Sequence, residues 1–337
     1  MTSLKVPPVD RDRAATALLA RSGFTGAESR PLAGDASFRR YSRLVKDGKT
    51  AILMDAPPPA ENVRPFVSMA LYLERLGYSA PRLLALDMEA GLLLLEDLGD
   101  DTFTRLLAGG HDEESLYGLA VDLLADLHGR SQAIPAGLAD YDDDKMLGEA
   151  ALLTDWYMPA ILGRETDAAV KARYLALWRS LLPTARGVPN SLVLRDFHVD
   201  NLMRLPRADL AACGLLDFQD AVGGPITYDL MSLLEDARRD VDPALAERMR
   251  ARYLARFPDL DREAFAASWA VLAAQRHAKV IGIFTRLWRR DGKSAYLVHI
   301  PRVWRMLEAA CAHPALAPLA AWLDAEIPAE RRTAPAP

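Results

Sequence analysis

The sequence predicts an α+β protein with two lobes, a small β-rich lobe at the amino terminus and a larger, mostly helical lobe after it. Short apolar runs between turn residues fill the first hundred positions, whereas apolar residues at helical spacing dominate the rest of the chain. Half of the 337 residues are apolar, which is enough for each lobe to bury a core. We place the lobes at 1–98 and 99–328, followed by a disordered tail at 329–337.

The small lobe is expected to begin with a helix and to continue as three strands, a second helix and two further strands. The segments are a helix over 9–21, a strand pattern at Phe38 and Tyr41, a hairpin over 43–54, a helix over 62–77 and two strands over 82–98. Asp47-Gly48 favours the tight type I′ turn of the hairpin, because both residue types tolerate a positive φ. Asn62 is suited to cap the second helix and Gly77 to end it.

The large lobe is predicted from helical periodicity. Residues 113–130 carry leucines and alanines at the spacing of a helix that packs on a core. Strand-like apolar runs follow at 192–205 and 214–218, and helical patterns dominate from 228 to about 325. The result is a mostly helical lobe with a short β segment near its middle.

Composition excludes several classes of protein. A net charge of −5 argues against a general nucleic-acid binder. No apolar run approaches the ~20 residues of a membrane span, and the first residues lack the apolar stretch of a signal peptide. We therefore expect a cytoplasmic protein without membrane contact. We also expect a monomer. Cys213 and Cys311 lie far apart and outside any zinc-type spacing, which argues against a disulfide framework or a zinc site.

Charge is unevenly distributed along the chain. Between 87 and 155 there are 17 Asp/Glu against three Lys/Arg, whereas 264–305 holds eight Lys/Arg against the single acid Asp291. The second segment is therefore a basic region in an acidic protein. Most of its arginines are expected on solvated helix faces.

Two short motifs resemble the end of a phosphate-binding P-loop. They are "DGKT" at 47–50 and "DGKS" at 291–294. The first glycine of such a loop would fall at Arg43 or Leu287, so its backbone cannot form the phosphate cradle. A hairpin turn and an exposed turn remain the better interpretations.

The segment "LVLRDFHVDNLMRL" at 192–205 places an acid, a histidine and an amide within apolar surroundings. Arg195-Asp196 followed by Asn201 has the R-D-x-x-x-x-N spacing of kinase-type loops, and Asp217 ends the next apolar strand. Phosphoryl transfer without a P-loop needs such a carboxylate base and such oxygen ligands for Mg²⁺. The intervening residues have the length of a hairpin that brings Asn201 and Asp217 together.

Each of these residues also has an ordinary structural interpretation. The D-x-x-x-x-N spacing alone arises by chance in many chains, and Asp196 could be a turn cap. The combination with a third carboxylate at hairpin distance favours catalysis. We expect His198 to hold the loop in shape rather than to move protons, and it is also a candidate substrate contact.

These residues carry a resemblance to a known family. "LRDFHVDNLM" with "LLDFQDAVGGPITYDLMSLL" resembles the aminoglycoside phosphotransferase family, whose members share a protein-kinase-like fold and a D-x-H-x-x-N loop. "LLADLH" and "LLLLEDL" are similar to the family's helix before that loop and to its interlobe hinge. The resemblance implies an ATP-dependent small-molecule kinase that uses Mg²⁺.

The resemblance also assigns roles to residues. It implies that Asp196 is the base, that Asn201 and Asp217 hold Mg²⁺, and that Asp229 anchors the helix that follows. The hinge backbone would pair with adenine, and "GDASFRRY" would cover the phosphates. The implied nucleotide contacts are Gly34, Ser37, Arg39, Glu96, Asp97 and Leu98.

Further segments resemble the anomeric amino-sugar kinases of bacterial cell-wall recycling. These segments are "GDASFRRY", "MDAPPPAENVRPF", "LEDLGDDTF" and "DFQDAVGGPITYDLMSLLEDA". The resemblance implies phosphorylation of N-acetylmuramate and N-acetylglucosamine on the C1 hydroxyl. Arg276 and His277 of the basic region are candidate partners for the lactyl carboxylate of N-acetylmuramate. Gln219, Asp220 and Glu235 are candidates for the sugar hydroxyls or the acetamido group.

The chain departs from the kinase pattern in two places. Met54 and Asp55 stand where the third strand usually supplies a lysine for the phosphates. Another group would have to neutralise the phosphates, and the candidates are Arg39, Arg40, Lys49 or the metal alone. The metal-binding segment reads Asp-Phe-Gln rather than Asp-Phe-Gly, so we expect no mobile activation loop.

Two alternatives stay open. One is another small-molecule kinase of the family, for an aminoglycoside, choline, homoserine or a different sugar. A polycationic aminoglycoside should prefer an acidic lobe, so the basic region counts against it. The other is a pseudokinase or nucleotide-binding regulator, which the missing lysine favours and the presence of Asp196 disfavours.

Overall fold

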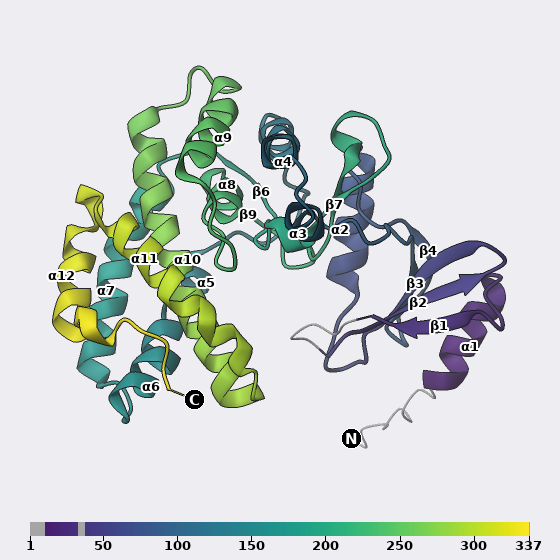
Figure 1. Ribbon diagram of the computed structural model, residues 1–337, viewed down its shortest axis with the longest axis horizontal. Helices are drawn as coiled ribbons and strands as arrows, with labels where there is room; N and C mark the ends of the chain where they lie inside the picture. The colour runs from purple at the N-terminus through teal and green to yellow at the C-terminus, as the bar shows by residue number, and fades with distance from the viewer. Residues whose placement is uncertain (1–10, 33–37, 337) are drawn as a thin grey trace. The chain divides into compact units, whose positions relative to one another are not determined.

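The computed structural model describes residues 11–32 and 38–336 (Figure 1). The described residues fall into two compact units. The smaller unit runs to Gly110 and includes Asp200–Asp220, and the larger unit consists of His111–Val199 and the chain from Ala221 on. The smaller unit holds a five-stranded sheet and the larger unit is mostly helical, which confirms the predicted α+β class.

The smaller unit is an antiparallel sheet with helices and a separate hairpin. Its sheet has the order β1-β2-β3-β5-β4. The elements are α1 (Arg11–Arg21), β1 (Glu28–Pro31), β2 (Arg40–Lys46), β3 (Lys49–Asp55), α2 (Arg64–Arg75), β4 (Leu83–Asp87), β5 (Leu92–Leu95), α3 (Phe103–Ala108), β7 (Leu202–Arg204) and β8 (Cys213–Leu215). After α1 the order of three strands, a helix and two strands is the predicted one, but β1 was not predicted at 28–31, and Tyr41 of the predicted first strand lies in β2.

Turn chemistry fixes the register of the β2–β3 hairpin. Asp47 and Gly48 have φ of 50° and 73°, and Lys46 pairs with Lys49 across them. The predicted two-residue turn is therefore confirmed. The helix cap differs by one residue, because α2 begins at Arg64 with Val63 in the capping position, although the Asn62 side chain still accepts the Arg64 N–H at 3.0 Å.

The β7–β8 hairpin belongs to the smaller unit although it comes late in the chain. The Leu215 N–H donates to the Ser79 carbonyl at 2.8 Å, and Met203 forms a β-bridge with Thr102. These bonds explain why 99–110 and 200–220 join the smaller unit, whereas the sequence assigns both to the carboxy-terminal lobe. The lobe limits at 98 and 328 stay a prediction.

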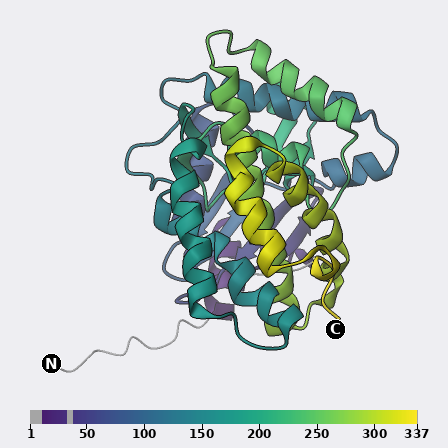
Figure 2. The ribbon, with the colours of Figure 1, turned by 90° about the vertical axis from the view of Figure 1, so that its left-hand side faces the viewer.

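The larger unit is built around the 30-residue helix α10, on which α7, α8 and α11 pack. In Figure 2, α7 in teal and α12 in yellow lie side by side on one face of this unit. The elements are α4 (Glu113–His128), α5 (Asp143–Ala150), the π-helix η1 (Leu153–Tyr157), α6 (Met158–Leu162), α7 (Ala168–Ala185), β6 (Asn190–Val193), β9 (Val222–Pro225), α8 (Thr227–Leu234), α9 (Pro243–Ala255), α10 (Arg262–Asp291), α11 (Ile300–Cys311) and α12 (Ala317–Glu326).

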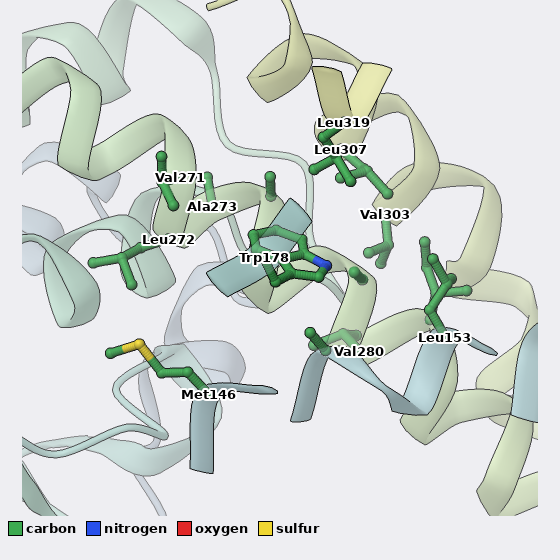
Figure 3. Packing of buried hydrophobic residues seen from close by; sticks show 14 of the residues in the cluster. Met146, Leu153, Trp178, Val271, Leu272, Ala273, Val280, Val303, Leu307 and Leu319 are labelled. Carbon is green, nitrogen blue, oxygen red and sulfur yellow. The ribbon is translucent and has the colours of Figure 1, made fainter. Parts of the chain in front are cut away.

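Close packing along α10 forms the core of the larger unit. Trp178 of α7 is fully buried among side chains of α10 and α11, including Val271 and Val303 (Figure 3). A Cβ at Gly282 would lie 2.3 Å from the Leu152 carbonyl carbon, so only glycine permits this close crossing. The helix is consequently fixed in position, and its buried polar residues are held with it.

The described part of the predicted tail, residues 329–336, contacts the larger unit, and its predicted disorder stays a prediction. The Tyr157 hydroxyl donates to the Arg331 carbonyl at 2.6 Å, and the Arg332 guanidinium contacts Glu308 at 2.8 Å. Among the described residues, Cys213 and Cys311 are free thiols, and no helix is long and apolar enough to cross a membrane.

Candidate active site

A buried aspartate fixes the backbone of the loop that carries Asp196. Strand β6 pairs antiparallel with β9, and the chain then turns at Arg195 with φ of 70°. The Asp229 carboxylate, in the first turn of α8 and fully buried, accepts the backbone N–H groups of Leu194 at 2.5 Å and Arg195 at 2.9 Å. These two bonds stabilise Arg195 in a left-handed backbone conformation, which is otherwise unfavourable for a residue other than glycine. Asp229 therefore orders this loop, whereas the sequence linked it only to its own helix.

The electrostatic environment keeps Asp196 ionised. Burial by itself would raise the pKa of this carboxyl, but the positive charges of Lys279 and Arg195 bring its pKa below the ordinary value. An ionised carboxylate is the form that accepts a proton. The geometry thus provides a carboxylate base at neutral pH.

Glu149 of α5 organises the cations beside Asp196. The Lys279 ammonium lies 3.1 Å from a Glu149 carboxylate oxygen, and the Arg195 guanidinium and the Tyr141 hydroxyl also hydrogen-bond this carboxylate. All four side chains are mostly buried, so the ion pairs are little screened by water. Sequence analysis missed Glu149, because nothing marks it within the acidic run that begins at Asp140.

Of the predicted substrate residues, Glu235 and His277 contact each other. Glu235 follows α8, and its carboxylate lies 2.6 Å from the His277 Nε2 and accepts the Trp269 Nε1–H at 2.6 Å. Glu235 and Trp269 line a cavity of about 780 Å³ in the larger unit, together with Phe265 and Arg250. Trp269 was not predicted, because a half-buried tryptophan at helical spacing is ordinarily part of a core.

His198 and Arg276 are both buried in the larger unit, with exposed fractions of 5% and 4%. Burial and the positive charge of Arg238 lower the pKa of His198, so its imidazole is neutral at pH 7. A neutral, buried imidazole suits the predicted supporting role better than proton transfer, and that role stays a prediction.

The smaller unit contains a cavity of about 320 Å³ with a mostly apolar wall and a polar end. Its size and lining suit a flat heteroaromatic ring. Asp217, Asn201 and Gln219 supply polar groups. The remaining lining residues are Leu32, Tyr41, Arg43, Ile52, Phe66, Pro81, Leu95, Asp97, Leu98, Gly99, Met203 and Leu216.

The hairpin brings Asn201 and Asp217 together in the lining of this cavity, as the spacing predicted. Leu202 pairs with Leu215, and the Leu216 N–H donates to the Asn201 carbonyl at 2.9 Å. Gln219, predicted to contact sugar, instead donates from Nε2 to Asp217 Oδ1 at 2.7 Å within the smaller unit. Asp220, the other candidate of this segment, is exposed.

The oxygen atoms of Asp217 and Asn201 suit a hard cation that takes its remaining ligands from a bound molecule. Asp217 and Asn201 offer a carboxylate and an amide oxygen, which are donor types that Mg²⁺ prefers. Among the described residues no group of three or more His, Cys, Asp or Glu is arranged to hold a metal. Mg²⁺ bound to phosphates needs only one or two protein ligands.

Arg39 is the candidate cation that lies beside Asp217. Its Nη1 is 3.9 Å from Asp217 Oδ1, its Nε is 3.5 Å from Glu61 Oε2, and its side chain is 13% exposed. Arg40, by contrast, is 71% exposed and pairs with Asp55 at 2.7 Å. Lys49 is exposed on β3. Sequence analysis missed Glu61, because a lone glutamate before a helix gives no signal.

The remaining nucleotide candidates differ in position. Asp97 and Leu98 line the cavity, and the Asp97 carboxylate contacts Arg43 at 2.8 Å. Glu96 does not line it, since its carboxylate bonds Arg82 and Arg207 and its N–H donates to the Arg82 carbonyl at 2.8 Å. Gly34 and Ser37 fall outside the described residues.

Comparison with known proteins shows the family to which the chain belongs. The model of the phosphotransferase enzyme family matches residues 28–267, which include every described candidate residue up to Glu235. A protein of Caulobacter vibrioides named N-acetylmuramate/N-acetylglucosamine kinase is 39% identical, over 96% of this chain and 98% of that protein. A Pseudomonas aeruginosa protein of the same name is 39% identical over 87% of each chain.

Solved structures share the fold at low sequence identity. A choline/ethanolamine kinase family protein from Mesorhizobium loti superposes with a TM-score of 0.62 at 16% identity, over 93% of this chain and 99% of that one. An aminoglycoside-3′-phosphotransferase of type VIII gives 0.52 at 18% identity, over 78% and 97%. These likenesses confirm the protein-kinase-like fold.

Proposed function

The chain belongs to the phosphotransferase enzyme family, and from that premise we propose that it is an ATP-dependent kinase for the C1 hydroxyl of N-acetylmuramate and N-acetylglucosamine. The observation that carries the reaction type is the position of Asp196, in a loop that Asp229 holds by two hydrogen bonds and beside the positive charges of Lys279 and Arg195. The substrate is supported by relatives at 37–39% identity that bear the names of both sugars.

Asp196 is the base in this proposal. Its carboxylate accepts the proton of the sugar hydroxyl as the hydroxyl oxygen bonds the γ-phosphorus of ATP, and the bond from that phosphorus to the bridging oxygen of ADP breaks. An anomeric hydroxyl is more acidic than the other hydroxyls of the ring, so one carboxylate suffices to take its proton. The Glu149–Lys279–Arg195 cluster keeps that carboxylate ionised and positioned.

The cavity of the smaller unit is the proposed nucleotide site. Adenine would lie among its apolar residues near Leu98, and Asn201 and Asp217 would hold Mg²⁺. When bound, Mg²⁺ neutralises negative charge on the phosphates. Arg39 is our candidate for the cation that replaces the third-strand lysine, with Glu61 in the supporting role of the glutamate that pairs with that lysine in protein kinases.

The larger unit is the proposed sugar site. Glu235, fixed by two hydrogen bonds, offers acceptor oxygens for hydroxyl groups along one wall of its cavity. Trp269 in the same cavity supplies an aromatic face of the kind on which sugar rings pack. Neutral His198 supports the loop that carries the base.

The test is Mg²⁺-dependent ATP consumption with N-acetylmuramate, N-acetylglucosamine, glucose, choline, homoserine and kanamycin. Phosphorus NMR of each product then locates the phosphate. We expect an anomeric phosphate from the two N-acetylated sugars. Turnover of choline, homoserine or kanamycin instead would leave the kinase assignment and overturn the substrate. Mg-ATP binding without turnover of any acceptor would favour the regulator.

A further inference from the structure

Arg276 is a buried cation whose charge no carboxylate in the described structure balances by direct contact. It lies near the middle of α10, is 4% exposed, and its Nη1 is buried without a hydrogen-bond partner among the described residues. The two other buried cations nearby, Arg195 and Lys279, both contact Glu149. An arginine N–H group that is buried without an acceptor is destabilising for the folded protein, so a ligand that supplies an acceptor oxygen there would bind favourably.

The surroundings of Arg276 belong to the catalytic loop of the larger unit. The next residue of α10, His277, contacts Glu235 at 2.6 Å, and the positive charge of Arg276 acts on Asp196, Asp229 and His198. Asp236, which also influences His198, is 1% exposed, and its Oδ2 is buried without a hydrogen-bond partner in the described structure. The Arg276 Nη1 and the Asp236 Oδ2 therefore both lie around this loop without a hydrogen-bond partner among the described residues.

We propose that Arg276 binds the carboxylate that distinguishes an acidic from a neutral amino sugar, which makes it the residue that determines specificity between the two. This inference rests on the proposed function. N-acetylmuramate is N-acetylglucosamine with a lactyl ether on C3, so the lactyl carboxylate is the one anionic group that separates the two acceptors. Arginine suits a carboxylate because its planar N–H groups match the two oxygens.

Two other occupants of the Arg276 site make different predictions. If Arg276 bound a phosphate oxygen of ATP, or interacted only with Asp196 or Asp229, this interaction would be the same with either sugar. Substitution of Arg276 would then slow both reactions alike. The ratio of the two kcat/KM values is thus the readout, since changes in the pKa of Asp196 or in folding cancel from it.

The first experiment compares Arg276→Gln with the wild type on both sugars. We expect kcat/KM for N-acetylmuramate to fall by about 10- to 100-fold relative to that for N-acetylglucosamine, the range for a charge-assisted hydrogen bond. Arg289→Gln, an exposed arginine on the same helix, is the matched control and should leave the ratio unchanged. Equal losses on both sugars, or no change of the ratio, would overturn the proposal.

The second experiment removes the charge from the sugar instead of the protein. The methyl ester of the lactyl group should lose the same factor with the wild-type enzyme and should lose nothing further with Arg276→Gln. If the ester and the acid react equally well with the wild type, the proposal is wrong even if Arg276→Gln folds poorly. A wild-type enzyme that phosphorylates neither sugar would overturn the proposed function itself, which is a different outcome from an unchanged ratio.

Discussion

Asp229 Oδ1 lies 2.9 Å from the backbone nitrogen of Arg195, so a fully buried residue of α8 determines the conformation of the residue directly before Asp196. Burial raises the pKa of Asp229 to about 7, although the N–H groups of Leu194 and Arg195 lower it. Burial therefore disfavours the ionised form of this carboxyl at neutral pH. Its place in the fold is explained by the loop that it orders.

Replacing Asp229 should destabilise the protein as well as slow it. Asp229→Ala leaves two buried N–H groups without acceptors, and we expect the free energy of unfolding to fall by about 2–4 kcal/mol. Chemical denaturation monitored by circular dichroism measures this loss. Asp229→Asn keeps one acceptor and should lose less. Equal stability of all three proteins would show that the two bonds do not hold the loop.

Replacing the base should abolish turnover without weakening nucleotide binding. Asp196→Asn is expected to lower kcat by about 10²- to 10⁴-fold, because the amide cannot accept the proton of the acceptor hydroxyl. The affinity for Mg-ATP, measured by calorimetry, should stay near that of the wild type. Near wild-type turnover in this variant would exclude Asp196 as the base.

Arg39 should matter for nucleotide binding where its neighbour does not. Arg39→Gln is expected to weaken Mg-ATP binding by about 10- to 100-fold, because it removes the cation beside Asp217. Arg40→Gln is the matched control, since Arg40 is exposed and pairs with Asp55. Calorimetry without acceptor gives both affinities. A larger loss in the Arg40 variant would reverse the assignment.

Removing the charge of Lys279 should change the pH dependence of catalysis. Lys279 is the foremost of the positive charges that lower the pKa of Asp196, so Lys279→Met should raise that pKa. The base acts when deprotonated, and the acid limb of the kcat/KM profile should therefore move to higher pH. Lys279→Arg keeps the charge and should leave the limb in place. The same limb in all three proteins would contradict this account.

Local patterns predicted much of the fold and the proximity of Asn201 to Asp217. Asp47-Gly48 predicted its hairpin because a two-residue turn with positive φ at both positions is encoded by those residues alone. The spacing from Asn201 to Asp217 likewise predicted a hairpin that brings the two together, because strand pairing over so short a loop leaves little choice. The kinase-like fold and the family followed from the same motifs.

Only the tertiary structure decided which charged residues serve these motifs. Glu149, Glu61 and Asp236 are ordinary acids in the sequence, and burial against Lys279, Arg39 and the catalytic loop gives them their significance. Among neighbouring arginines, Arg39 and Arg40 are alike in sequence, yet one side chain is 13% exposed and the other 71%. Periodicity and spacing act within a few residues of the chain, whereas burial and charge pairing depend on segments that meet only after folding.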